Sequence, residues 1–184
     1  MHYWSLKVLA ILALVMGVSL SVLSSPDGDF LTAEEIDKIQ DAQEIERRIE
    51  IYLEAAALRL KKAAERLSGM EPQEGDELEF FTVEDMLDSY YRILRSVMLN
   101  LDDVYQKPNK DLNQFEKALK KTKKTAENAA PELESLKKTA EEQKKEQVWR
   151  LVNRAIDLTK GVQDGVEQGL SELEAAAERR RRSR

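Results

Sequence analysis

The 184-residue chain has no cysteine and a single histidine, His2. Without cysteine it has neither disulfides nor a thiolate nucleophile. Without a histidine beyond position 2 it lacks the usual general base and an ordinary zinc site. The Glu-x-x-His motif of di-iron bundles and the Walker phosphate loop are missing as well. We therefore expect a protein that is not an enzyme and that carries no cofactor and no metal ion.

Helix-breaking residues are also scarce, with four prolines and seven glycines. Hydrophobic residues make up 42% of the chain and charged residues 35%, which is outside the range of disordered chains. Alanine, glutamate, lysine, leucine and arginine dominate, as they do in proteins built from long helices. The length suits one domain.

The chain has only one long uncharged run, which lies at its N-terminus. Lys7 precedes residues 8–23, and small residues follow before Pro26. This layout predicts a secretory signal peptide over residues 1–24, cleaved after Ser24. The alternative is an uncleaved membrane anchor, because the uncharged stretch approaches the ~20 residues that span a bilayer. The lack of cysteine and of Asn-X-Ser/Thr sites favours export in a bacterium, to the periplasm or the exterior.

Charge is divided unevenly along the chain, whose net charge is −6. Residues 25–108 carry 10 basic and 21 acidic side chains, whereas residues 109–184 carry 18 basic and 14 acidic ones. Opposite signs favour packing of the two halves on each other, or pairing between chains. We expect no nucleic-acid partner.

Two segments begin with the same capping pattern. "FLTAEEI" places Glu35 three residues after Thr32, and "FFTVEDM" places Asp85 three residues after Thr82; each pair predicts a capping box. The first predicted helix continues to residues 68–69, where Gly69 supplies a left-handed cap.

Two further amphipathic segments complete the pattern. One begins near Asn109 and stops at residues 128–130; the other starts at Pro131, a residue suited to a first helical turn, and runs to Glu178. Short connections favour antiparallel neighbours. We therefore predict an all-α fold over residues 25–178: an elongated antiparallel up-and-down helical bundle or coiled coil of about four helices.

Three glycines at a four-residue spacing, Gly161, Gly165 and Gly169, form what we call the glycine strip. Each costs a helix about 0.8–1.0 kcal/mol relative to alanine. Each precedes an apolar residue, so the strip flanks the apolar seam of its helix. It predicts close packing against another helix of the chain, for which residues 54–60 are a candidate, or an open groove for a second copy or a partner.

The chain ends in an arginine tail, residues 179–184, containing Arg179, Arg180, Arg181, Arg182 and Arg184. One interpretation is a solvated helix end that the helix dipole favours. The other is adhesion to an anionic membrane surface or envelope polymer.

Residues 68–81 form an acidic loop with Glu71, Glu74, Asp76, Glu77 and Glu79. Their spacing is not that of an EF-hand, which favours a solvated connector over a calcium site.

The leading hypothesis is an exported, non-enzymatic helical bundle of the cell envelope that acts through protein–protein contacts, including self-association. The alternative is a peripheral binder of anionic lipid or polymer, and a carboxylate-based hydrolase is a distant third.

Overall fold

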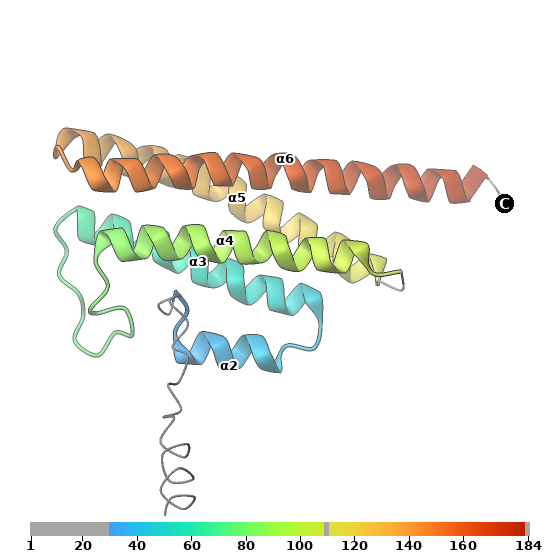
Figure 1. Ribbon diagram of the computed structural model, residues 1–184, viewed down its shortest axis with the longest axis horizontal. Coiled ribbons are helices and arrows are strands. Elements are labelled where there is room, and N and C mark those ends of the chain that lie inside the picture. The colour runs from blue at the N-terminus through green and yellow to red at the C-terminus, as the bar shows by residue number, and fades with distance from the viewer. Residues whose placement is uncertain (1–29, 109–110, 183–184) are drawn as a thin grey trace, which may run out of the picture.

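The computed structural model describes residues 30–108 and 111–182, so the predicted signal segment and Arg184 lie outside the described residues. This part of the chain contains five helices and no strand (Figure 1). They are α2 (Ala33–Asp41), α3 (Ile45–Leu67), α4 (Val83–Gln106), α5 (Leu112–Glu142) and α6 (Glu146–Arg182). The all-helical prediction is confirmed and the helices pack as a bundle. The expected number of about four is not confirmed, and the coiled coil stays a prediction.

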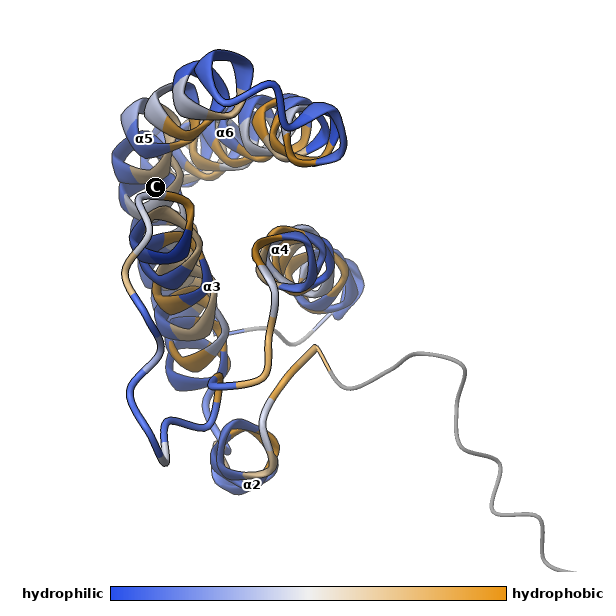
Figure 2. Cartoon of the chain, turned by 90° about the vertical axis from the view of Figure 1, so that its left-hand side faces the viewer, coloured by the Kyte–Doolittle hydropathy of each residue, from blue (hydrophilic) through white to orange (hydrophobic). Residues whose placement is uncertain are grey.

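Helices α3 to α6 form two antiparallel hairpins that pack on each other. Helix α3 lies against α4, and α5 lies against α6, while α3 also packs on α5 and α4 on α6. Consecutive helices α4 and α5 adjoin only weakly, so they occupy a diagonal of the bundle. Apolar faces point toward the space between the helices, as Figure 2 shows. The apolar stripes therefore form a single core.

The predicted first helix is in fact two helices, because the chain leaves helical geometry at residues 42–44. Ala42 is buried at this corner, and its carbonyl accepts a hydrogen bond from Arg48 Nη2 at 3.0 Å. The turn lets the short α2 fold back against α3. Neither glycine nor proline marks it, which explains why a continuous helix was expected.

The predicted break before Pro131 is wrong, since α5 passes through this proline and ends eleven residues later. A proline inside a helix costs about 3 kcal/mol. Ala126, Ala129, Leu133 and Leu136 keep their helical spacing across it, and all four are buried. The apolar residues of α5 on both sides of Pro131 pack against α3 and α6, and this burial outweighs the backbone hydrogen bond that the proline cannot make.

The actual turn between α5 and α6 is centred on Lys144, whose φ is 56°. The Lys144 N–H donates to the Glu141 carbonyl at 3.0 Å, and the Lys145 N–H donates to the Ala140 carbonyl at 2.9 Å. This pair of bonds is a Schellman motif, which normally has glycine at the left-handed position. Gly69 fills that position after α3, with φ 89°, as predicted.

Both predicted capping boxes are present. The Thr32 N–H donates to Glu35 Oε2 at 2.8 Å, and the Thr82 N–H donates to Asp85 Oδ2 at 2.9 Å. In turn, the backbone N–H of each acidic residue donates a hydrogen bond to the hydroxyl oxygen of its threonine. These boxes fix where α2 and α4 begin.

One polar contact crosses the core between α4 and α6. Thr159 donates its hydroxyl proton to the Ala155 carbonyl at 2.8 Å, which leaves its oxygen to accept from the Tyr90 hydroxyl at 2.8 Å. Both side chains are buried, so this pair sets the register of the two helices.

Of the helices in the described residues, none is both long and apolar enough to cross a bilayer.

Candidate functional site

The glycine strip lies on α6 where that helix adjoins α4 and α5. A Cβ added at Gly165 would lie 3.2 Å from Met98 Cε of α4, and one at Gly169 would lie 3.3 Å from Leu119 Cδ1 of α5. A Cβ at Gly161 would meet nothing within 4 Å. Residues 54–60 belong to α3, which does not contact α6 in the described part of the chain, so they do not cover the strip. At two of the three glycines the end of a side chain from a neighbouring helix thus lies close to α6, although Gly165 is exposed and Gly169 is half-buried.

Beside these two glycines lies a pocket of about 260 Å³ between α4, α5 and α6. Its apolar lining includes Met98, Leu101, Phe115 and Leu119. At its rim the Tyr105 hydroxyl donates to Glu172 Oε2 at 2.7 Å. This hydrogen bond raises the pKa of Tyr105. The pKa of Glu172 is lowered by a hydrogen bond from Gln168 and, next to it, by the one from Tyr105. The strip therefore borders a small, partly open gap in the bundle.

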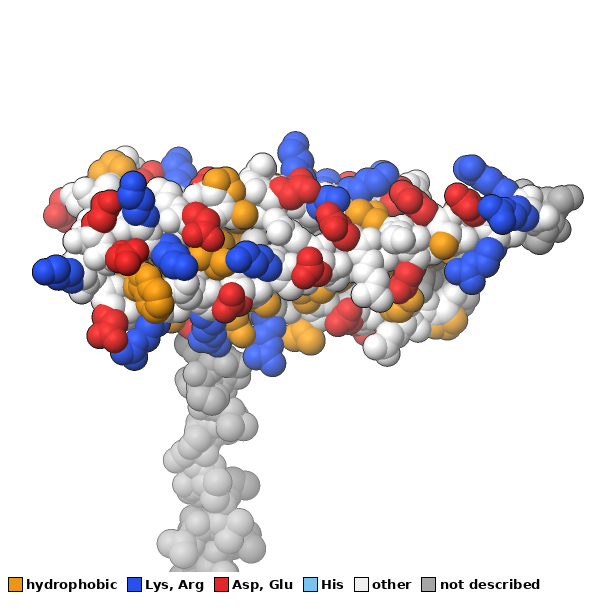
Figure 3. Space-filling view, turned by 90° about the horizontal axis from the view of Figure 1, so that it is seen from above, with side chains coloured by type: hydrophobic (Ala, Val, Ile, Leu, Met, Phe, Trp, Pro, Cys, Tyr) orange, Lys and Arg blue, Asp and Glu red, His pale blue; other side chains and the backbone are white. Residues whose placement is uncertain are grey.

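The arginine tail continues α6 beyond the ends of the neighbouring helices (Figure 1). Residues 177–182 are all exposed, and Lys and Arg side chains gather at this end of the molecule (Figure 3). Arg179 Nε donates to the Ala175 carbonyl at 3.3 Å, and Arg182 lies 3.5 Å from Glu178. Both of these contacts stay within α6, while Arg180 borders a pocket that Tyr105 of α4 and Leu112 of α5 also line.

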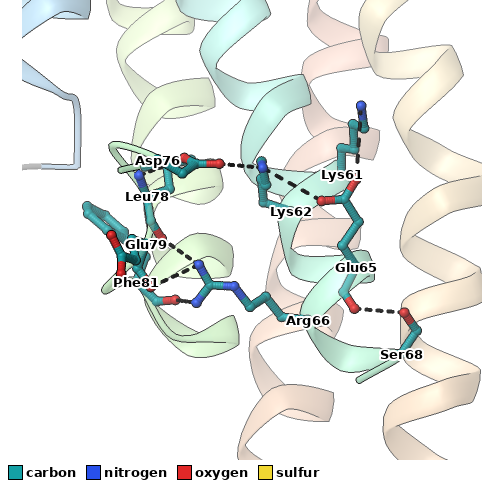
Figure 4. A network of polar contacts seen from close by, with 9 residues as sticks. All are labelled: Lys61, Lys62, Glu65, Arg66, Ser68, Asp76, Leu78, Glu79 and Phe81. Carbon is teal, nitrogen blue, oxygen red and sulfur yellow. Dashed lines mark hydrogen bonds and ion pairs between the residues drawn. The ribbon is translucent and has the colours of Figure 1, made fainter. Parts of the chain in front are cut away.

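The acidic loop, at the opposite end of the bundle, is held to α3 by two cations (Figure 4). Arg66 donates to the carbonyls of Phe81, Leu78 and Glu79, at 2.5, 2.7 and 3.0 Å. Lys62 Nζ lies 2.5 Å from Asp76 Oδ2. This contact, reinforced by the backbone N–H of Leu78, lowers the pKa of Asp76. A connector expected to be merely solvated is thus fastened to α3 along residues 76–81.

The fastening divides the loop into inward and outward side chains. Leu78 is buried, and Glu79 accepts the Gly75 N–H at 2.9 Å. The outward acidic residues are Glu71, Glu74 and Glu77, which are exposed. Phe80 is 88% exposed and Met70 is 56% exposed. The loop therefore holds an uncovered aromatic ring and a thioether among carboxylates.

Trp149 is 38% exposed near the start of α6. Nearby, the Arg154 guanidinium stacks 3.7 Å from the centre of the Tyr91 ring, which joins α6 to α4. Val148, rather than Trp149, enters the core.

In the described residues no group of three histidine, cysteine, aspartate or glutamate side chains lies close enough together to hold a metal ion.

Sequence patterns indicated the arginine tail and the glycine strip, but they gave no sign of how firmly the acidic loop is held. The basic residues that hold it, Lys62 and Arg66, lie on α3 and resemble ordinary solvated charges in the sequence. Comparisons of the chain with protein-family models, curated proteins and solved structures found no match. Its function is therefore inferred from its own residues.

Proposed function

We propose that the chain is an exported, non-enzymatic helical-bundle protein of the bacterial cell envelope that acts through protein–protein contacts. The observation that carries this proposal is Phe80, 88% exposed on a loop that Arg66 and Lys62 fasten to α3. A fully buried phenylalanine side chain is worth about 1.5–3 kcal/mol relative to an exposed one. Because the fixed backbone keeps the ring exposed to water, a partner that buries the ring gains this free energy on association.

The charges around Phe80 favour a protein over a membrane as its partner. Glu77 and Glu79 lie within three residues of the ring, and no basic residue occurs in the acidic loop. An anionic bilayer repels such a loop, whereas a protein can present cations and apolar side chains together. The fixed loop also loses little conformational entropy on binding.

A pull-down of the purified protein, at high salt and with its N-terminus mapped, tests this function. We expect stoichiometric complexes that survive high salt and that Phe80→Ser weakens at least about tenfold, matching the lost burial. Lys138→Ser, at an exposed position of α5, is the matched control and should leave the complexes intact. Equal recovery with Phe80→Ser, or no stoichiometric complex, would overturn the proposal.

The arginine tail supports a second function, adhesion to an anionic lipid or polymer surface. Four described arginines lie on the end of α6 that projects from the bundle, where a flat surface can reach them. Near an anionic bilayer each is worth about 1 kcal/mol, which salt screens. Removing residues 179–184 should lower retention on anionic vesicles. Equal, salt-insensitive retention of both forms would exclude this function.

A further inference from the structure

We propose that copies of this chain associate head to tail, with the arginine tail of one copy docked on the acidic loop of the next. This inference rests on the proposed function and names a second copy as one of its partners. The two surfaces lie at opposite ends of the long axis of the bundle (Figure 1). A rigid rod cannot bring its own ends together, so the contact is between copies.

Charge complementarity is the first support for this contact. The acidic loop has five acidic and no basic residues, and its outward carboxylates are Glu71, Glu74 and Glu77. The tail presents Arg179 to Arg182 on successive positions of one helical turn. Guanidinium groups pair with carboxylates through two parallel hydrogen bonds, which gives such a contact direction as well as attraction.

Apolar surface is the second support, since both ends combine charged residues with exposed apolar side chains. On the loop, Phe80 and Met70 are exposed. On α6, Ala175 and Ala177 are exposed just before the arginines, on different sides of the helix, and neither carries a large side chain. An aromatic ring can lie over one of these alanines with its face toward a guanidinium, an arrangement worth about 0.5–1 kcal/mol at an exposed site.

The geometry of the contact predicts open assemblies. A head-to-tail contact uses two different surfaces, so each added copy leaves one loop and one tail available. Unless the rotation between copies closes a ring, the product is a chain of copies whose length rises with concentration. The small contact area and its charge predict a weak interaction that added salt reverses.

Charge reversal at each end gives the sharpest test. One variant carries R179E, R180E, R181E and R182E; the other carries E71K, E74K and E77K. Each should remain monomeric where the unmodified protein associates, because like charges then face each other. Mixed one to one, they become complementary at both contacts and should associate again. Sedimentation velocity of the purified protein, with its N-terminus mapped, measures all of these states.

The controls separate this inference from loss of fold and from the proposed function. Lys124→Glu with Lys160→Glu changes exposed lysines between the two ends and should leave association unchanged. We expect a loss of at least about tenfold in association constant for each reversed variant, and recovery on mixing. A monomeric unmodified protein, unaffected variants, or a mixture that does not recover would each overturn head-to-tail association. Phe80-dependent complexes with other proteins would survive that result.

Discussion

Arg59 and Glu35 form a two-pronged ion pair that ties α2 to α3. Arg59 Nη1 lies 3.0 Å from Glu35 Oε1, and Nη2 lies 2.7 Å from Oε2. The Arg59 side chain has no exposed surface, and its Nη2 also donates to the Phe30 carbonyl. Glu35 Oε2 accepts the Thr32 N–H as well. One carboxylate therefore caps α2 and fastens it to the bundle.

We predict that Arg59→Leu lowers the free energy of unfolding by about 3 kcal/mol, because it strips a largely buried carboxylate of its partner. Denaturant titration measures the loss. Arg47→Leu is the matched control on α3, since Arg47 pairs with Glu50 at the surface and should cost less than about 1 kcal/mol. Equal losses in the two variants would contradict the tie between α2 and α3.

Tyr90 predicts an alkaline loss of stability, because burial raises its pKa to about 12. A tyrosine in the unfolded chain has the ordinary pKa of 10.0, so it releases its proton at a lower pH than Tyr90 does in the fold. The contribution of protonated Tyr90 to the free energy of unfolding is therefore complete below pH 10 and is lost as the pH rises to 12. The difference amounts to about 3 kcal/mol. Denaturant titrations across this range should show a shallower fall for Tyr90→Phe than for the unmodified protein. Parallel curves would contradict the assignment.

Lys144→Gly should stabilise the protein by about 1 kcal/mol. A side chain in the left-handed region costs roughly 1–2 kcal/mol, and glycine removes that cost at the price of a freer unfolded chain. Lys138→Gly, in the helical body of α5, should instead cost about 1 kcal/mol. Thermal unfolding of both variants checks the opposite signs. A melting temperature that falls in both would contradict the Schellman turn.

The glycine strip predicts a graded response to alanine. Gly161→Ala meets open space and should gain up to about 1 kcal/mol from helix propensity. Gly165→Ala and Gly169→Ala must displace the ends of Met98 and Leu119, so we expect smaller gains or losses. Denaturant titration ranks the three. Equal gains at all three positions would show that α4 and α5 do not restrict the strip.

Local signals predicted several helix ends correctly, and the failures were in features that depend on distant contacts. Thr32 and Thr82 mark helix starts because their partners lie three residues away. Pro131 marks a stop in sequence, but packing on other helices carries α5 through it. Lys144 ends α5 without glycine, so no local signal announces that turn.

The candidate surfaces divide in the same way. The arginine tail and the glycine strip are legible in sequence because they are runs or regular spacings of one residue type. Which side chains approach Gly165 and Gly169 depends on how the helices adjoin, and no short-range pattern specifies that. Arg66 holds carbonyls twelve to fifteen residues away, so its role appears only in three dimensions.

Photo-crosslinking from position 80, in the cells that make the protein, tests protein contact through the acidic loop most directly. A photoreactive phenylalanine replacing Phe80 should give discrete adducts with a second protein, whether another copy or a different chain. The same probe at Lys138, an exposed site on α5, should give none of these bands. Identical patterns from both positions, or no protein adduct from position 80, would contradict the account.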